Sequence, residues 1–583
     1  MHSSSDRSAL EALQKLEYRG YDSFGFVSNS NVPTKFLGAI SKQNLCKSID
    51  PTSRCTIAHT RWATHGVVSL ENTHPHQSYS KAFSVVHNGV ITNFKFLRAL
   101  LDRKHIPANI SQTDTEVIAH MLEYLHTSKK DYSSLADLVL DVCDLLEGEF
   151  AICVTSPLWE NTLVCARKNS PLVVALNASE AMVASDECAL PEQFSQSIDI
   201  PNKSVLQLTS YLGYIDPIIL LKNQPPIRDF SKLFKSIVRD LDSTLDESKY
   251  DSFMLKEMSD IPNNLEALAQ RDFRDIAETL SRQRLILIGC GSAYYAAQLG
   301  HIMRNTSSRD GFADSFSFQA DELPSMYKTR LSDTLICISQ SGETYDTLEP
   351  AKEHIAIGGD VVSITNGKAS SLAKLSTQTI HQDIGVERCV LATKSVVSQC
   401  AIMYQLFSSE GKNLSDFADV WRRCFDGQLL SSILDIAKIC MRFDNFFFIG
   451  RGILLPVAME NALKLKEVTY CHAEGMGGGF FKHGTLSLID DRFVTFAHQP
   501  NPEFDPLGYS LIEANISEIK ARNGRVIRIG HTRDSDIVLP SISVHLDAML
   551  HLGFGQYLAY FFARVLGRDI DRPRSLAKSV TVR

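Results

Sequence analysis

The chain has 583 residues, of which 44% are apolar and 22% are charged, and its formal net charge is −8. This length is enough for about two to four globular domains. The negative charge balance excludes a general electrostatic attraction to nucleic acid or to an anionic membrane, although one local basic pocket for a phosphorylated ligand is compatible with it. No apolar run approaches the roughly 18 residues of a membrane-spanning helix.

The first residues and the cysteines both favour an intracellular protein. Residues 1–6 lack the basic and then apolar pattern of a secretion signal. The 13 cysteines follow neither the paired CxxC spacing of a zinc site nor the dense spacing of a disulfide framework. Scattered cysteines of this kind are typical of reduced thiols, so we expect a cytoplasmic protein without a bound metal.

The sequence pattern changes along the chain. Residues 1–212 mix short β-rich runs with helical stretches, whereas residues 213–272 are polar and are interpreted as a partly helical connector. Residues 273–413 and 437–573 each repeat an apolar strand, a loop of small residues and a helix, and residues 574–583 form a tail. Continuous apolar strands that alternate with helices predict two doubly wound α/β domains in tandem, each with a parallel sheet.

Two loops of the first repeat could hold a phosphate group. In the loop Gly289-Cys290-Gly291, Tyr294 stands where a dinucleotide-binding loop has its third glycine, so that interpretation is weak. In residues 339–344, Ser-Gln-Ser-Gly-Glu-Thr, three hydroxyls and an amide lie between a strand and a helix, where backbone N–H groups attract an anion. Helix capping alone would explain one hydroxyl, so we favour a phosphate site at this second loop.

The helix that follows Gly452 carries groups able to move protons. Lys464 and Glu467 are three residues apart and therefore share one helical face, although from spacing alone a surface ion pair is the more common explanation. His483 follows in the sequence Lys-His-Gly. A carboxylate and an imidazole are groups that suit general acid–base catalysis.

Three motifs in these repeats resemble the glutamine–fructose-6-phosphate aminotransferase family. SQSGETYDT at 339–347 is similar to the phosphate loop of its sugar isomerase (SIS) domains, and ALKLKE at 462–467 to its catalytic helix. DIDRPRSLAKSVTVR at 569–583 resembles its C-terminus almost residue for residue. The resemblance implies two SIS domains after a class II glutamine amidotransferase domain, which is an αββα sandwich.

The resemblance also implies a set of residues that hold the sugar phosphate. They are Ser292, Ser339, Gln340, Ser341, Thr344, Val390 and Ala577. Three positions depart from the family pattern: Ala293 and Ala392 replace hydroxyl residues, and Phe480 replaces a glutamate. The two alanines remove substrate-facing hydroxyls, which could weaken sugar binding.

Four residues receive catalytic roles through the same resemblance. Glu467 is expected to be the proton-transfer base, with Lys464 beside it, and His483 is expected to open the sugar ring. Lys578 is expected to form a Schiff base with the keto group, because an iminium nitrogen withdraws electrons during proton transfer.

Five ordered motifs in the N-terminal region resemble the amidotransferase domain. They are LEYRGYDSFG at 16–25, HTRWATHG at 59–66, HPH at 74–76, HNGVITN at 87–93 and TDTEV at 113–117. The resemblance implies that Arg61 and Asp114 bind the two charged ends of glutamine. It implies that Asn88 and the Gly89 N–H form the oxyanion hole, and that Trp62 lies near a loop that closes the site.

The nucleophile of that domain has no counterpart in this sequence. The family begins Cys-Gly-Ile-Val-Gly after loss of methionine, whereas this sequence starts a few residues later in the alignment. Cys46 and Cys55 are internal and match no motif, so we expect no glutamine hydrolysis by the family mechanism and a sheet without its first strand. A late start codon, a truncated gene or direct use of ammonia would explain this, and the first is favoured because the glutamine-binding residues are present.

The resemblance implies synthesis of glucosamine 6-phosphate from fructose 6-phosphate, with glutamine or ammonia as nitrogen donor, in amino-sugar biosynthesis. It implies a homodimer and no cofactor. Two alternatives stay open: an ammonia-dependent synthase or isomerase with a relic N-terminal half, and a non-catalytic sugar-phosphate sensor. Glu467, His483 and Lys578 together favour an enzyme, and the three departures from the family pattern favour the sensor mildly.

Overall fold

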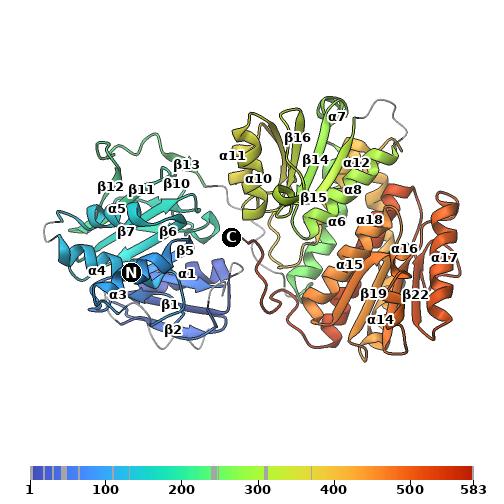
Figure 1. Ribbon diagram of the computed structural model, residues 1–583, viewed down its shortest axis with the longest axis horizontal. Coiled ribbons are helices and arrows are strands. Elements are labelled where there is room, and N and C mark those ends of the chain that lie inside the picture. The colour runs from blue at the N-terminus through green and yellow to red at the C-terminus, as the bar shows by residue number, and fades with distance from the viewer. Residues whose placement is uncertain are drawn as a thin grey trace. The chain divides into compact units, whose positions relative to one another are not determined.

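The computed structural model describes residues 4–17, 20–28, 32–40, 49–62, 66–107, 110–129, 132–237, 246, 248–307, 313–368 and 370–580 (Figure 1). These residues fall into two compact units, which divide at residues 241 and 242. Among the described residues, no helix combines the length and the apolar character needed to cross a membrane.

The N-terminal unit contains three antiparallel sheets. The first has the order β2 (Thr34–Leu37), β1 (Ser23–Ser28), β3 (Thr56–Arg61). The second has the order β12 (Tyr214–Leu221), β11 (Ser204–Tyr211), β7 (Thr162–Lys168), β6 (Gly148–Thr155), β5 (Ser84–Ile91), β4 (His76–Gln77). The third has the order β13 (Phe234–Ser236), β10 (Gln196–Asp199), β8 (Val173–Leu176), β9 (Ala181–Ala184).

Helices cover the outer faces of the first two sheets. The six-stranded sheet shares an apolar core with α3 (Phe94–Arg103), α4 (Glu116–Ser128) and α5 (Leu135–Leu145). The three-stranded sheet packs against α1 (Ser5–Leu16), and the two sheets meet through Val27, Ile57 and Val86. This layering confirms the αββα sandwich. The expected loss of a first strand concerns residues before this sequence and stays a prediction.

The C-terminal unit contains two parallel sheets of the same topology. The first has the order β15 (Ser315–Gln319), β14 (Arg284–Gly289), β16 (Asp333–Ile338), β17 (Asp360–Thr365), β18 (Gln378–His381). The second has the order β20 (His472–Gly477), β19 (Asn445–Gly450), β21 (Phe493–His498), β22 (Arg525–Gly530), β23 (Ile537–Val538). The tandem repeat of doubly wound domains is thereby confirmed.

Both sheets are covered on two faces, which explains their continuous apolar strands. The helices around the first sheet are α6 (Phe253–Ala269), α7 (Arg274–Ser281), α8 (Ser292–Thr306), α9 (Leu323–Met326), α10 (Tyr345–Ala356), α11 (Ser371–Leu375) and α12 (Lys394–Phe407). In the second sheet, Phe446 and Phe448 face a core shared with the first domain, whereas Phe447 and Ile449 face the opposite core.

The remaining helices belong to the second half of the unit. They are α13 (Leu414–Cys424), α14 (Gly427–Cys440), α15 (Leu454–Thr469), α16 (Gly478–Phe481), α17 (Pro506–Lys520) and α18 (Val544–Val565). Helix α18 is buried on nearly all sides and is mostly apolar, and it packs along α15 (Figure 1). The core that joins α8, α12, α15 and α18 holds the two parallel-sheet domains together.

The expected connector over residues 213–272 contains regular structure. Its first part forms β12 and β13, which belong to sheets of the N-terminal unit, and its last part forms α6 of the C-terminal unit. The domain boundaries at 1–212, 273–413, 437–573 and 574–583 stay predictions, but β12 places residues 214–221 inside the N-terminal unit.

Candidate active site

Loop 339–344 connects β16 to α10, and its hydroxyl groups converge. Ser339 Oγ lies 3.1 Å from Thr344 Oγ1 and accepts a hydrogen bond from the Gly342 N–H at 3.1 Å. Ser341 Oγ accepts from the Glu343 N–H at 3.1 Å, and the Gln340 carbonyl accepts from the Asn366 N–H at 3.0 Å. The hydroxyls therefore order the loop instead of merely capping α10, since Thr344 makes no side-chain cap.

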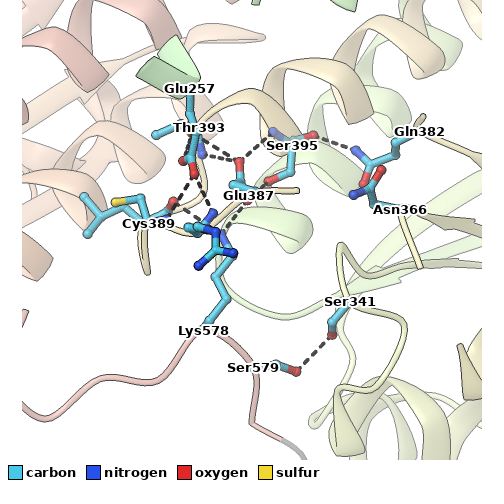
Figure 2. A network of polar contacts seen from close by, with 12 residues as sticks. Glu257, Ser341, Asn366, Gln382, Glu387, Cys389, Thr393, Ser395, Lys578 and Ser579 are labelled. Carbon is cyan, nitrogen blue, oxygen red and sulfur yellow. Dashed lines mark hydrogen bonds and ion pairs between the residues drawn. The ribbon is translucent and has the colours of Figure 1, made fainter. Parts of the chain in front are cut away.

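The C-terminal tail lies on this loop. Ser579 Oγ is 2.9 Å from Ser341 Oγ (Figure 2). The Tyr345 N–H at the start of α10 donates to the Val580 carbonyl at 3.0 Å. The N–H groups that an anion would use are thus occupied by the loop's own hydroxyls and by the tail. A phosphate group bound here would replace some of these contacts.

Lys578 reaches from the tail into a buried polar network (Figure 2). Its Nζ atom lies 2.5 Å from Glu387 Oε2 and 3.5 Å from the Leu391 carbonyl. The Lys578 side chain is 6% exposed and that of Glu387 is 0% exposed. The neighbouring backbone also holds the tail, because the Val390 N–H donates to the Asp571 carbonyl at 3.2 Å. Ala577 is half-buried beside Lys578.

A second buried carboxyl, Glu257 of α6, approaches the same loop. Its Oε1 atom accepts from the N–H groups of Arg388 at 2.5 Å and Cys389 at 3.1 Å. Burial, and to a smaller extent the negative charge of Glu387, raises the pKa of Glu257 above its ordinary range. Burial also acts to raise the pKa of Glu387, but the Lys578 ammonium and the Ser395 hydrogen bonds outweigh it and lower that pKa.

Helix α15 holds a lysine between two glutamates. Lys464 Nζ lies 2.7 Å from Glu467 Oε2 and 3.5 Å from Glu460 Oε1. Lys464 is 1% exposed, so the surface ion pair that spacing alone favours is wrong. Burial acts to lower the pKa of Lys464, but the two carboxylates outweigh it and raise that pKa. Burial raises the pKa of Glu460 to about 7, even though Lys464 opposes this shift.

Ser292 links the two parallel-sheet domains at this point. It begins α8 of the first domain, and it lies close enough to Glu460 of the second domain to act to lower the pKa of that carboxyl group, against the larger effect of burial. Ser292 thus lies near the group formed by Glu460, Lys464 and Glu467. No side-chain hydrogen bond or ion pair among the described residues joins this group to the Lys578 network.

His483 stands apart from both groups. It follows α16 and is exposed, and its backbone N–H donates to the Phe480 carbonyl at 2.9 Å. Within the described part of the chain, no hydrogen bond or ion pair connects the His483 side chain to Glu467 or Lys578. The neighbouring Phe480 is 73% exposed, so the residue that replaces the family's glutamate points an apolar ring into solvent.

The expected glutamine-binding residues gather at the edge of the N-terminal sheets. Arg61 and Asp114 are both buried, and burial lowers the pKa of Arg61 while Asp22 and Asp114 oppose that shift. Asp114 Oδ2 accepts from the Ile91 N–H at 2.7 Å. Trp62 is half-buried and directly follows Arg61 at the end of β3.

The expected oxyanion-hole residues lie on β5. The Asn88 side chain is exposed, and its Oδ1 atom lies 2.8 Å from His59 Nε2. Gly89 has a φ of +131°, and a Cβ atom there would lie 2.1 Å from the Glu149 carbonyl oxygen, so only glycine fits. His59 thus orients Asn88, a contact that the sequence motif did not reveal.

Cys55 gives no nucleophile in this unit. Burial raises the pKa of Cys55 to about 12, which keeps its thiol protonated at neutral pH. Cys46 lies outside the described residues. The sequence motifs did not reveal three carboxyl groups of these networks, because only tertiary contacts bring them to Lys578 and Lys464. They are Glu257, Glu387 and Glu460.

Comparisons with known proteins agree with this architecture. A family model described as "Glutamine amidotransferase domain" matches residues 59–192, and one described as "SIS domain" matches residues 280–409 and 442–558. The C-terminal domain of glucosamine-fructose-6-phosphate aminotransferase from Francisella tularensis has a similar fold. It is 24% identical with a TM-score of 0.50 and covers 56% of this chain and 100% of that chain. The protein is therefore an amidotransferase domain joined to two SIS domains.

Full-length relatives define the family. A Methanococcus maripaludis protein is 33% identical over 605 residues, which cover 98% of this chain and 97% of the relative. A Thermotoga maritima protein is 33% identical over 617 residues, with the same coverage. Both are named glutamine–fructose-6-phosphate aminotransferase (isomerizing). The chain belongs to the glutamine–fructose-6-phosphate aminotransferase family.

Proposed function

We propose that this protein converts D-fructose 6-phosphate and L-glutamine to D-glucosamine 6-phosphate and L-glutamate, the first step of hexosamine synthesis. The observation that carries the proposal is the position of the tail. Ser579 contacts Ser341 of the phosphate loop, and the preceding residue, Lys578, is buried with its amine against Glu387. One short segment thus links the expected phosphate site to an amine able to attack a keto group.

In the proposed reaction, the loop hydroxyls hold the phosphate and Lys578 forms a Schiff base with C2 of the open sugar. The binding residues are proposed to be Ser292, Ser339, Gln340, Ser341, Thr344, Val390 and Ala577. Glu467 moves the proton between C1 and C2, and Lys464 holds its carboxylate in position at 2.7 Å. His483 opens the sugar ring.

The direct test is formation of glucosamine 6-phosphate from fructose 6-phosphate by the wild type and by Lys578→Met. We expect the wild type to form product and the variant to lose turnover by at least about a thousandfold, because no other amine replaces the Schiff base. Fructose 6-phosphate should still bind to the variant in calorimetry. Unchanged turnover would contradict the role of Lys578, and binding without turnover in the wild type would favour a sugar-phosphate sensor.

The nitrogen donor is proposed to be glutamine, with ammonia as the alternative. Arg61, Trp62, Asn88, Gly89 and Asp114 are proposed to bind glutamine, and the buried thiol of Cys55 supports no role for it as nucleophile. Parallel assays with glutamine and with an ammonium salt separate the two donors. Product from ammonium alone would support an ammonia-dependent synthase, and product from both would support a complete amidotransferase. Mass spectrometry of the protein made from its native gene would identify the first residue.

We propose a cytoplasmic homodimer in which His483 acts in the site of the other subunit. The exposed position of His483 supports this, since the chain does not bring it to its own Glu467. The test is to mix two inactive variants, Lys578→Met and His483→Ala, after reversible dissociation. Random pairing should restore about one quarter of wild-type activity, because each mixed dimer contains one intact site. No recovery from a protein that is dimeric in ultracentrifugation would contradict the shared site.

A further inference from the structure

Two buried carboxyl groups share one hydroxyl beside Lys578. Thr393 Oγ1 lies 3.1 Å from Glu257 Oε2 and 3.1 Å from Glu387 Oε1 (Figure 2). A threonine hydroxyl has a single hydrogen and can donate to only one of these oxygens. The other oxygen forms a hydrogen bond with Thr393 only when it carries a proton and donates it. Both contacts are therefore hydrogen bonds when one of the two carboxyl groups is protonated.

The remaining contacts decide which carboxyl is ionised. Glu387 accepts from the N–H and hydroxyl groups of Thr393 and Ser395 and from the Lys578 ammonium. Among the described residues, Glu257 accepts only from two backbone N–H groups, and its second oxygen lies beside the Thr393 hydroxyl. Five donors, one of them charged, stabilise a carboxylate at Glu387. Glu257 is accordingly the protonated partner. Its carboxyl O–H donates to Thr393 Oγ1, and the Thr393 hydroxyl donates to Glu387.

We propose that Glu387 is the fixed counter-ion of the Lys578 nitrogen, first as an ammonium and then as the iminium of the sugar Schiff base, and that protonated Glu257 keeps this pocket at a single negative charge. This proposal rests on the proposed function. It assigns a task to two residues, one of which lies in the region that the sequence presents as a connector.

The charge balance of the reaction fits a counter-ion that never changes its protonation. Lys578 loses a proton and attacks C2, so that a C–N bond forms. The C2–O bond then breaks, and the oxygen leaves as water with the protons that the nitrogen has given up. The iminium nitrogen keeps one hydrogen and one positive charge, so the pocket holds the same charge before and after the step. An anion at Glu387 stabilises this cation, which draws electrons from the C1–H bond.

The other titratable groups near Glu387 do not replace it. Lys394 of α12 is directed to Asp260 of α6, with 3.5 Å between Nζ and Oδ2. Burial raises the pKa of the Cys389 thiol well above its ordinary value. Asp571 of the tail accepts from the N–H groups of Phe253 and Met254 at the start of α6. Among the described residues, the Lys578 ammonium is the only cation in contact with Glu387.

The test combines a pH–rate profile with borohydride trapping of the Lys578–fructose 6-phosphate adduct, detected by mass spectrometry. In Glu387→Gln the cationic nitrogen loses its counter-ion, so it gives up its proton at lower pH. The pH optimum should fall by about one to three units, and the trapped adduct at pH 8 should fall at least about tenfold. An unchanged optimum and an unchanged trapping yield would overturn the proposal.

Two further variants separate charge from packing. Glu387→Asp keeps the negative charge, so its pH optimum should stay within about half a unit of the wild type even where its rate falls. A shift of about one unit or more in Glu387→Asp would overturn the proposal, and this criterion holds even if the glutamine variant does not fold. Glu257→Gln is neutral, like the protonated acid, and should lose less turnover at pH 7 than Glu387→Gln. Equal losses would contradict the division of charge.

The control is Glu266→Gln, which removes a carboxylate from α6, the helix that carries Glu257. Glu266 of α6 forms a partly exposed ion pair with Arg422 at 2.9 Å, and its loss should leave the pH optimum and the trapping yield unchanged. The wild type distinguishes failure of the proposed function from failure of the counter-ion role. If it forms neither product nor adduct, the proposed function fails. If it forms both and Glu387→Gln keeps the wild-type pH profile, only the counter-ion role fails.

Discussion

The two parallel-sheet domains share one strand order but carry different loops at the same place. In the first domain, β16 leads into the hydroxyl-rich loop 339–344 and then into α10. In the second, β21 leads into Gln499-Pro500-Asn501-Pro502 and then into α17. Asp505 caps α17, and its carboxylate accepts from the Gly508 N–H at 2.8 Å. A carboxylate at a helix N-terminus fills the position that a phosphate would need and repels it.

The helices that follow the first strand of each domain also differ, and here the second domain carries the functional side chains. Helix α15, which follows β19, places Glu460, Lys464 and Glu467 on one face, and the first two of them are buried. Helix α8, which follows β14, contains no aspartate, glutamate or lysine and begins at Ser292. The two sheets are thus alike while their side chains differ, which fits the proposed function, in which the first domain holds the phosphate and the second moves protons.

The largest effect is expected when the proton-moving helix is disabled. Glu467→Gln should lower turnover by about 10² to 10⁴, because an amide cannot accept the proton, while fructose 6-phosphate binding is retained. Steady-state kinetics and calorimetry measure the two effects. Glu474→Gln, an exposed position on β20, is the control and should change neither. A weaker affinity for fructose 6-phosphate with unchanged turnover would indicate that Glu467 binds the substrate and does not transfer the proton.

The phosphate loop can be made to resemble its counterpart in the second domain. Thr344→Asp places a carboxylate at the start of α10, as Asp505 does at α17, and should weaken fructose 6-phosphate binding at least about a hundredfold through charge repulsion. Thr344→Val should weaken it about tenfold, because only a hydrogen bond to a charged group is lost. Calorimetric titration of both variants checks this. Equal affinities for the two variants would argue that the phosphate binds elsewhere.

Alanine substitutions at two glycines, one in each domain, compare how closely the two loops are packed. Gly342 has a φ of +67°, and a Cβ atom there would lie 2.2 Å from Ser370 Oγ. Gly452 has a φ of +53° with open space around it. Gly342→Ala should reduce the free energy of unfolding by about 2–4 kcal/mol through backbone strain and overpacking. Gly452→Ala should cost about 1–2 kcal/mol through strain alone. Urea denaturation measures the free energy of unfolding of both variants. Equal decreases in the two variants would contradict close packing between Gly342 and Ser370.

The smallest effect is the contribution of a buried histidine of the second domain to acid sensitivity. Its β21 ends in His498, whose Nδ1 lies 3.0 Å from Nδ1 of His551, and His551 Nε2 lies 3.2 Å from His531 Nε2. Burial lowers the pKa of His498 to about 3. The unfolded chain, with a histidine pKa near 6.5, takes up the proton first as the pH falls.

The free energy of unfolding should therefore decrease from about pH 6.5 downward and continue to decrease until the pH approaches 3. Between pH 7 and pH 5.5, the loss due to His498 should be about 1 kcal/mol. Thermal unfolding at these two pH values measures it, and His498→Asn should flatten the dependence. His472→Asn, at an exposed position, is the control. A wild-type stability that is independent of pH over this range would contradict a neutral, buried His498.

Local patterns in the sequence were enough for most of the fold. The apolar runs at 285–288, 334–338 and 446–449 became β14, β16 and β19, because strands covered on both faces must be apolar throughout. The hydroxyl loop and the tail motif were also recognisable, since each is a continuous segment. The connector was predicted less well, because the strand β12 within it is half-exposed and its burial pattern is irregular.

The sequence by itself determined the domain order, the family and the residues of each continuous motif, because those properties lie in short segments that can be read in order. Only the tertiary structure decided which charges meet. Glu257 and Thr393 are 136 residues apart, and folding alone places them with Lys578. It also decided that Lys464 is buried and that His483 is exposed. Burial and charge pairing depend on neighbours from distant segments, and these neighbours set the protonation on which the chemistry depends.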